Sequence, residues 1–173
     1  MSIVSEDMLI DAVTDADTPI GVVRRDEVFD RHVNFRVVHV LIFNSVGDLL
    51  IQQLAATRTR HPGYWGSSVA AYLFSGEGYE AGARRRIAEE LGIHEIGLRF
   101  IGKTVMDDEG CHKFIGVFVA THNGPFHYDH AHIAALQFIE PSRIRDLRRA
   151  GALRLTPTFI RVLAFYESRR DSA

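Results

Sequence analysis

The segment Ala71–Ile93 reads AYLFSGEGYEAGARRRIAEELGI and holds the most informative pattern in the chain. From Tyr79 onward an apolar residue recurs at every fourth position, which predicts an amphipathic helix. The apolar positions are Tyr79, Ala83, Ile87 and Leu91. Gly92 follows the last of them, where a helix C-terminus favours glycine. The segment therefore predicts a loop that leads into a helix of about three turns.

One face of this helix carries charge where a core contact is expected. At 100° per residue, Glu90 falls within the apolar arc, so its carboxylate needs a partner. Arg86 lies one turn earlier and Glu89 borders the same edge, so the three side chains project to a common region. One interpretation is an ion pair between Arg86 and Glu90, with the basic residue first, which is the weaker order. The other interpretation is a pair of carboxylates that binds a cation.

The full spacing resembles the Nudix box, a loop-and-helix motif that holds divalent metal against a diphosphate. The box runs Gly, five residues, Glu, seven residues, Arg-Glu, an aliphatic, any residue, Glu-Glu, any residue, Gly and an aliphatic. The matching positions are Glu77, Arg85, Glu89, Glu90, Gly92 and Ile93. Two positions differ, because Ala71 replaces the first glycine and Arg86 replaces the glutamate after Arg85.

The resemblance implies a fold of the α/β (α+β) class, a Nudix-type α/β/α sandwich with a mixed sheet. It also implies a hydrolase that cleaves a diphosphate linkage in a nucleotide or similar small metabolite with Mg²⁺ or Mn²⁺. Glu89 and Glu90 match the catalytic, metal-binding carboxylates, and the backbone carbonyl near Ala71 is a further expected ligand. The structural residues of the box are Glu77, Arg85 and Gly92.

Arg86 changes what this site is expected to do. In related hydrolases the glutamate at this point often serves as a metal ligand or a base, and arginine does neither at neutral pH. The replacement makes the local charge two units less favourable for a cation, at roughly 3 kcal/mol per unit pair at about 5 Å and an effective dielectric near 20. We therefore expect weak metal binding to the free protein, with metal and diphosphate binding together and Arg86 contacting phosphate. A Nudix-fold module that binds its ligand without turnover remains an alternative.

A second stretch, Arg58–Val69, resembles the isopentenyl-diphosphate isomerase branch of the Nudix superfamily. His32 and His39 likewise resemble two metal-binding histidines of that branch, although a histidine in a strand is usually a packing residue. The catalytic cysteine of the isomerase corresponds to Ala70, and a metal-binding histidine corresponds to Tyr72. Its two downstream acidic ligands fall where this chain has Cys111 and Lys113. An isomerase-like reaction on a prenyl diphosphate is an alternative that lacks one proton-transfer group.

Other polar residues add candidates outside the box. Arg58 and Arg60 are candidates for binding substrate, because arginine forks match phosphate oxygens, and the alternative is an ordinary exposed loop. Asp107–Glu109 is a candidate source of a replacement base or a simple acidic turn. The group His127, Asp129, His130 and His132 has a spacing that suits a transition metal or a solvated loop.

The rest of the sequence predicts one domain. At 173 residues the chain suits a single core, with residues 1–15 as a loosely held lead-in and residues 16–173 as the Nudix-like domain. We expect a mixed sheet with helices on its faces. The expected strands are Pro19–Arg24, Arg36–Phe43, Leu49–Gln53, Leu98–Met106, Lys113–Ala120 and Ile133–Ile139. The expected later helices are Pro141–Arg149 and Pro157–Arg169, each beginning with proline.

Composition limits the partners. A net charge of -2 gives no broad electrostatic reason to bind nucleic acid or membrane, so the expected partner is a small-molecule diphosphate. The single cysteine forms no internal disulfide, and no signal peptide or membrane span is visible. These features predict a cytoplasmic protein. The oligomeric state stays open, a homodimer included.

Overall fold

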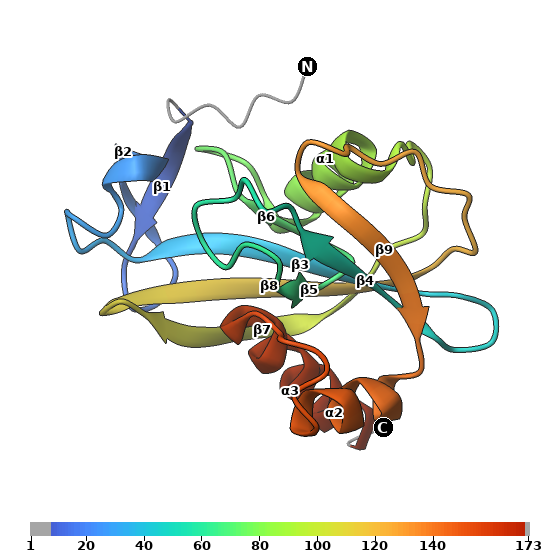
Figure 1. Cartoon of the computed structure of the whole chain (residues 1–173). Coiled ribbons are helices and arrows are strands. Elements are labelled where there is room, and N and C mark those ends of the chain that lie inside the picture. The colour runs from blue at the N-terminus through green and yellow to red at the C-terminus, as the bar shows by residue number, and fades with distance from the viewer. Residues whose placement is uncertain (1–7, 172–173) are drawn as a thin grey trace.

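The computed structural model describes residues 8–171, which form one mixed sheet, a small hairpin and three α-helices (Figure 1). Within this range the sheet has seven strands in the order β5-β4-β3-β8-β7, with β6 beside β3 and β9 beside β4. Only β3 and β8 run parallel among the paired strands described. The sheet strands are β3 (Phe35–Phe43), β4 (Leu49–Leu54), β5 (Trp65–Gly66), β6 (Val69–Tyr72), β7 (Arg99–Asp108), β8 (Cys111–Thr121) and β9 (Ile133–Ile139).

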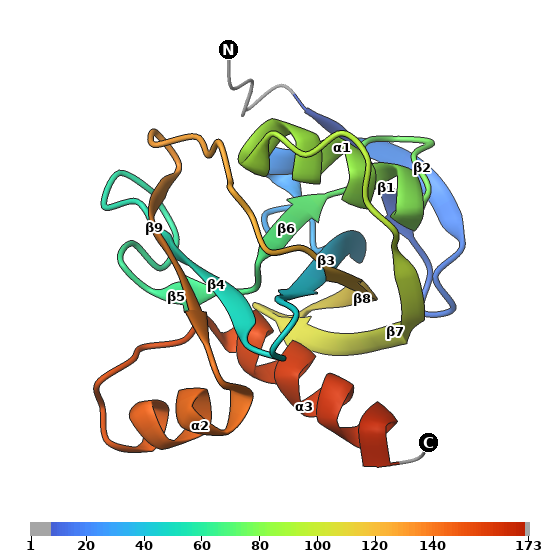
Figure 2. The same ribbon diagram turned by 90° about the vertical axis from the view of Figure 1, so that its right-hand side faces the viewer.

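Helices cover both faces of this sheet (Figures 1 and 2). The helix α1 (Tyr79–Leu91) lies on one face, whereas α2 (Pro141–Arg149) and α3 (Pro157–Asp171) lie on the other. The sheet therefore forms the middle layer of an α/β/α sandwich, as the sequence predicts.

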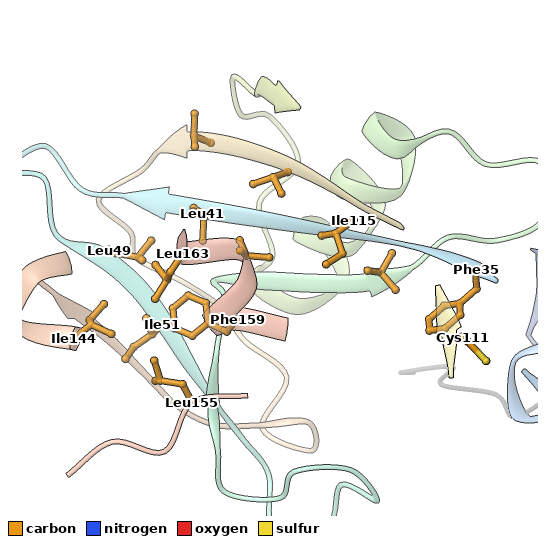
Figure 3. Packing of buried hydrophobic residues seen from close by; sticks show 14 of the residues in the cluster. Phe35, Leu41, Leu49, Ile51, Cys111, Ile115, Ile144, Leu155, Phe159 and Leu163 are labelled. Carbon is orange, nitrogen blue, oxygen red and sulfur yellow. The ribbon is translucent and has the colours of Figure 1, made fainter. Parts of the chain in front are cut away.

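The alternation of side chains along β3 divides the core between these two faces. Val38, Val40 and Ile42 belong to the cluster that includes Ala83, Ile87 and Leu91 of α1. Residues of the opposite parity pack with α3 in a second cluster, shown in Figure 3. Its members include Phe35, Leu41, Leu49, Ile51, Ile115, Phe159 and Leu163.

Most predicted elements are present with small shifts at their ends. The strand at Pro19–Arg24, the strand at Ile133–Ile139 and the helix at Pro141–Arg149 match in both bounds. Gly92 caps α1 in the left-handed conformation with φ of 70°, which confirms the predicted helix end. Two short strands, β5 and β6, were not predicted, because two and four residues carry too little alternation to be recognised.

The expectation of a loose lead-in is wrong for Leu9–Val13. These residues form β1, which pairs with β2 (Pro19–Arg24) in a separate two-stranded sheet, and Ile10 is buried. The acidic residues of this segment obscure the strand pattern in the sequence. In the structure Asp11 accepts hydrogen bonds from Ser75 and Gly76 in the loop before α1. Residues 1–7 of the expected lead-in lie outside the described residues. A short 3₁₀ helix, η1 (Arg25–Glu27), follows β2.

No helix between residues 8 and 171 is both long and apolar enough to cross a membrane.

Candidate active site

A pocket of about 200 Å³ lies between the C-terminal half of α1, strands β3 and β6, and the loop that joins β4 to β5. Six basic and two acidic side chains line it, so positive charge predominates. The basic residues are Arg25, Arg58, Arg60, Arg85, Arg86 and Lys113, and the acidic residues are Glu89 and Glu90. A concave surface with one sign of charge attracts ligands of the opposite sign.

Glu77 and Arg85 connect the loop before α1 to the helix. Arg85 donates from Nε to Glu77 Oε2 at 2.8 Å and from Nη2 to Glu77 Oε1 at 2.9 Å. The Phe74 amide donates to the same carboxylate at 3.0 Å, and Arg85 Nη2 also donates to the Tyr72 carbonyl at 3.0 Å. Such a bidentate pair fixes geometry as well as adding energy. The contact that the box pattern predicts between Glu77 and Arg85 is therefore present.

Arg86 lies between the two acids that the resemblance assigns to metal. It donates from Nη1 to Glu89 Oε2 at 3.0 Å, and its Nε lies 3.2 Å from Glu90 Oε1. The Arg86 and Glu90 side chains are only 13% and 4% exposed, whereas Glu89 is 44% exposed. Burial raises the pKa of Glu90, although Arg86 and Arg58 act in the opposite direction. The ion pair considered from the sequence is thus formed, and Glu90 points inward as its helical position predicts.

Lys113 forms a second buried cationic group at the pocket. Its Nζ lies 2.7 Å from Asp108 Oδ2 and donates to Thr158 Oγ1 at 2.7 Å. Arg60 binds the same carboxylate through Nη2 at 2.9 Å. Burial alone would raise the pKa of Asp108, but the hydrogen bonds from Arg60 and Lys113 hold it below its usual range. Burial lowers the pKa of Lys113, and Asp108 opposes that change.

Arg58 differs from these paired cations. Within residues 8–171, its guanidinium has no hydrogen-bond or ion-pair partner, although it lines the pocket. Burial lowers the pKa of Arg58, and the charge of Glu90, which lines the same pocket, raises it. An arginine stays charged in either case. Arg25 also lines the pocket, with Cζ 5.3 Å from the centroid of the Tyr72 ring.

The structure separates the two histidines considered as metal ligands. His39 is buried at the pocket, and its Nδ1 lies 2.8 Å from Ser67 Oγ. Burial and the charge of Lys113 lower the pKa of His39 to about 3, so its imidazole is neutral. His32 is an exposed loop residue with φ of 52° and does not line the pocket. Only His39 of the two lines the pocket, and their pairing at one metal stays a prediction.

The residues present do not form a complete divalent-metal site. No cluster of three or more His, Cys, Asp or Glu side chains suited to a metal occurs in the described part of the chain, the loop at residues 127–132 included. Glu89 and Glu90 supply carboxylate oxygens, and Ala71 lines the same pocket, but Arg86 contacts both acids. A fixed cation at this distance opposes a second one.

A larger and more open groove, of about 1010 Å³, lies among β3, β7 and the helices α2 and α3. Its lining combines three basic with three acidic side chains, so it concentrates no charge of one sign. These are Arg99, Arg145, Arg170, Glu140, Glu167 and Asp171. The smaller pocket is therefore the better candidate for an anionic ligand.

The fold and the box together define the class of this protein. The NUDIX domain family matches residues 33–159, which include the whole pocket face of α1, and the chain belongs to this family. Solved Nudix hydrolases share this fold.

Individual relatives refine the comparison. The chain is 32% identical over 162 residues to an uncharacterized Nudix hydrolase of Pseudomonas aeruginosa, covering 94% of this chain and 95% of that protein. It is also 32% identical over 144 residues to an isopentenyl-diphosphate Δ-isomerase of Nocardia farcinica, with 80% and 82% covered. A crystal structure of a Deinococcus radiodurans protein superposes with a TM-score of 0.79 at 22% identity, covering 91% and 99% of the two chains. The Nudix domain of Shewanella oneidensis NrtR, solved with ADP ribose, gives 0.63 at 11% identity, with 85% and 99% covered.

Sequence reasoning missed part of this pocket. The sequence marks Lys113 only as the residue at a lost acidic position, and Asp108 only as part of an acidic turn or as a source of a base. Their pairing needs the β7–β8 hairpin, in which Asp108 lies opposite Cys111, two residues before Lys113. Arg25 was not considered, because nothing local connects it with Tyr72. A basic residue in a mostly apolar strand was the signal available for Lys113.

Proposed function

We propose that this protein is a Nudix hydrolase that binds a diphosphate-bearing nucleotide or small metabolite in the arginine-lined pocket and cleaves its diphosphate linkage. The observation that carries this proposal is Arg58, a partly buried guanidinium that lines the pocket and makes no hydrogen bond or ion pair with a described side chain, while the nearby Glu90 is already paired with Arg86. Buried charges are normally paired, so an anionic ligand is the fitting partner. The ADP ribose bound by the NrtR domain carries a diphosphate, which supports the same ligand chemistry.

The proposed reaction needs stabilisation of charge at phosphorus. Water attacks one phosphorus atom and releases a proton to the solvent, the bond from that phosphorus to the bridging oxygen breaks, and the bridging oxygen leaves with additional negative charge. Arg58 and Arg86 are proposed to hold the phosphate oxygens, because arginine forks match their geometry. Arg60 is tied to Asp108 and is proposed to orient the loop next to the phosphates.

Mg²⁺ or Mn²⁺ belongs to this proposal through the family resemblance, with Glu89, Glu90 and the carbonyl of Ala71 as the residues assigned to it. Because Arg86 contacts both acids, we propose that such an ion is bound only when a diphosphate adds its negative charge. Calorimetry with Mg²⁺ and no ligand is expected to give weak or undetectable binding. Tight binding under those conditions would contradict this order.

Binding without turnover is the second candidate, and the position of Arg86 favours it. If Arg86 keeps Glu89 and Glu90 occupied, the pocket retains its affinity for phosphate but not its hydrolytic chemistry. An isomerase is less well supported, although some relatives carry that name. The position of the isomerase cysteine holds Ala70, and Tyr72, at the position of a metal-binding histidine, stacks on Phe35 with ring centroids 5.5 Å apart.

The test is a panel of nucleoside diphosphate derivatives with Mg²⁺ or Mn²⁺, scored for release of phosphate or monophosphate. The hydrolase predicts turnover of at least one compound, and Arg86→Glu, which restores the family glutamate, should hydrolyse it faster. Arg84→Gln is the matched control, since Arg84 lies on the same helix and pairs with exposed Glu80. Thermal stabilisation by a compound that neither parent nor Arg86→Glu cleaves would instead identify a binding module.

A further inference from the structure

Two cations of the pocket are already held by protein carboxylates and are oriented before any ligand arrives. Arg86 is fixed by Glu89 and Glu90, and its side chain is 13% exposed. Lys113 is fixed by Asp108 and Thr158, and its side chain is 9% exposed. Oriented charges in a partly desolvated site attract an anion more strongly than mobile surface charges do.

These cations retain donors for a ligand. The Lys113 ammonium donates once to Asp108 and once to Thr158, and an ammonium has one further N–H. Arg86 donates from Nη1 and approaches Glu90 with Nε, while its Nη2 has no acceptor within residues 8–171. The Arg58 guanidinium has every N–H available by the same criterion. Together they offer donors from three different elements: α1, β8 and the β4–β5 loop.

We propose that the pocket binds the diphosphate oxygens directly through Arg58, Arg86 and Lys113, so that ligand capture requires no divalent metal ion. This inference rests on the proposed function for the ligand class but is independent of turnover. In this pocket, fixed protein cations would neutralise the diphosphate charge, which the family resemblance assigns to a metal ion. Burial lowers the pKa of both Arg58 and Lys113, and neighbouring arginines lower both pKa values further.

On this proposal, the residue at position 86 decides whether diphosphate binds with or without a divalent metal ion. With arginine at this position, Glu89 and Glu90 are neutralised by the protein, and phosphate meets a cation directly. With glutamate there, three carboxylates would face the pocket, and they would repel phosphate until a divalent ion entered. Ligand binding should then become dependent on metal.

The experiment is calorimetric titration of the full chain with methylenediphosphonate, a non-hydrolysable diphosphate, once in EDTA and once in Mg²⁺. The parent is expected to bind in EDTA with a Kd no more than about tenfold above its value in Mg²⁺, where the ion joins the complex, a difference of about 1.4 kcal/mol or less. Arg86→Glu is expected to lose about tenfold or more in EDTA, the value of at least one charge-assisted hydrogen bond, and to recover affinity in Mg²⁺. Arg84→Gln, which changes an exposed arginine on the same helix, should match the parent in both buffers.

Arg58→Gln keeps the test informative if Arg86→Glu does not fold. Arg58 has no side-chain partner among the described residues, so its replacement breaks no internal hydrogen bond, and affinity in EDTA should fall about tenfold. Binding by the parent only in Mg²⁺, or in neither buffer, overturns the inference. Binding in EDTA without hydrolysis of any diphosphate in the panel supports the inference and refutes the hydrolase instead.

Discussion

The bidentate pair between Glu77 and Arg85 should contribute far more to stability than its exposed neighbour pair between Glu80 and Arg84. The Glu77 and Arg85 side chains are 14% and 19% exposed, and the carboxylate accepts two arginine N–H bonds and one backbone N–H bond. Glu77→Gln keeps the shape of the side chain but removes its charge. The loss should be roughly 2–4 kcal/mol, since charge-assisted bonds are worth about 1.5–3 kcal/mol each and glutamine replaces them only in part.

Urea unfolding and thermal unfolding measure this loss. For a domain of this length the expected fall in Tm is about 4–16 °C, at about 2–4 °C per kcal/mol. Glu80→Gln is the matched control, because Glu80 and Arg84 are 60% and 45% exposed and such pairs contribute about 0–1 kcal/mol. Equal destabilisation by the two substitutions would refute the argument that the Glu77 pair holds the loop on the helix.

Three further predictions follow from buried groups. Gly116→Ala should destabilise by at least about 2 kcal/mol in urea unfolding, because the new Cβ would lie 2.3 Å from Cδ1 of Tyr79, whose hydroxyl is held by hydrogen bonding. The pKa of Asp108 is lowered in the folded state, so its contribution to the free energy of unfolding is complete above about pH 4 and is lost as pH falls through the folded pKa. Asp108→Asn should therefore reduce the loss of stability in acid, as measured by urea unfolding at a series of pH values. Because the pKa of His39 is about 3, its ring NMR signals should stay unchanged from neutral pH down to about pH 4, and a titration near pH 6 would contradict its burial.

The sequence predicted the fold wherever one element carries its own periodic signal. The four-residue apolar repeat of α1 and the apolar run of β3 each report which face is buried, and both were recognised. The β1 strand was missed because Asp11 interrupts a five-residue segment, and its role as acceptor for Ser75 and Gly76 depends on a loop more than sixty residues away. Such a contact is set by tertiary packing and has no local signature.

The candidate site was predictable to the extent that it lies on one helix. Spacing alone placed Glu90 inward and brought Arg86 beside it, since both follow from 100° per residue. The other half of the pocket comes from strands, a loop and the start of α3, which only the assembled sheet brings together. Lys113 is the clearest example, because its partners Asp108 and Thr158 lie five and forty-five residues away.

Arg86 and Lys113 are more informative together than either is alone. Each is a largely buried cation in a pocket where the family resemblance implies a bound metal, and each lies beside a carboxylate that neutralises it. A buried pair of this kind offers little net stability over well-packed apolar side chains, so stability is a poor reason for two of them to line one small pocket. Binding of an anion accounts for both cations. Their fixed positive charge would stabilise the bound anion, and their carboxylate partners would stay in place. The charge of Arg86 also disfavours a divalent ion bound to the free protein, because arginine and metal would both neutralise Glu89 and Glu90. Comparing ligand affinity in EDTA and in Mg²⁺ measures how far the protein cations alone suffice to bind diphosphate.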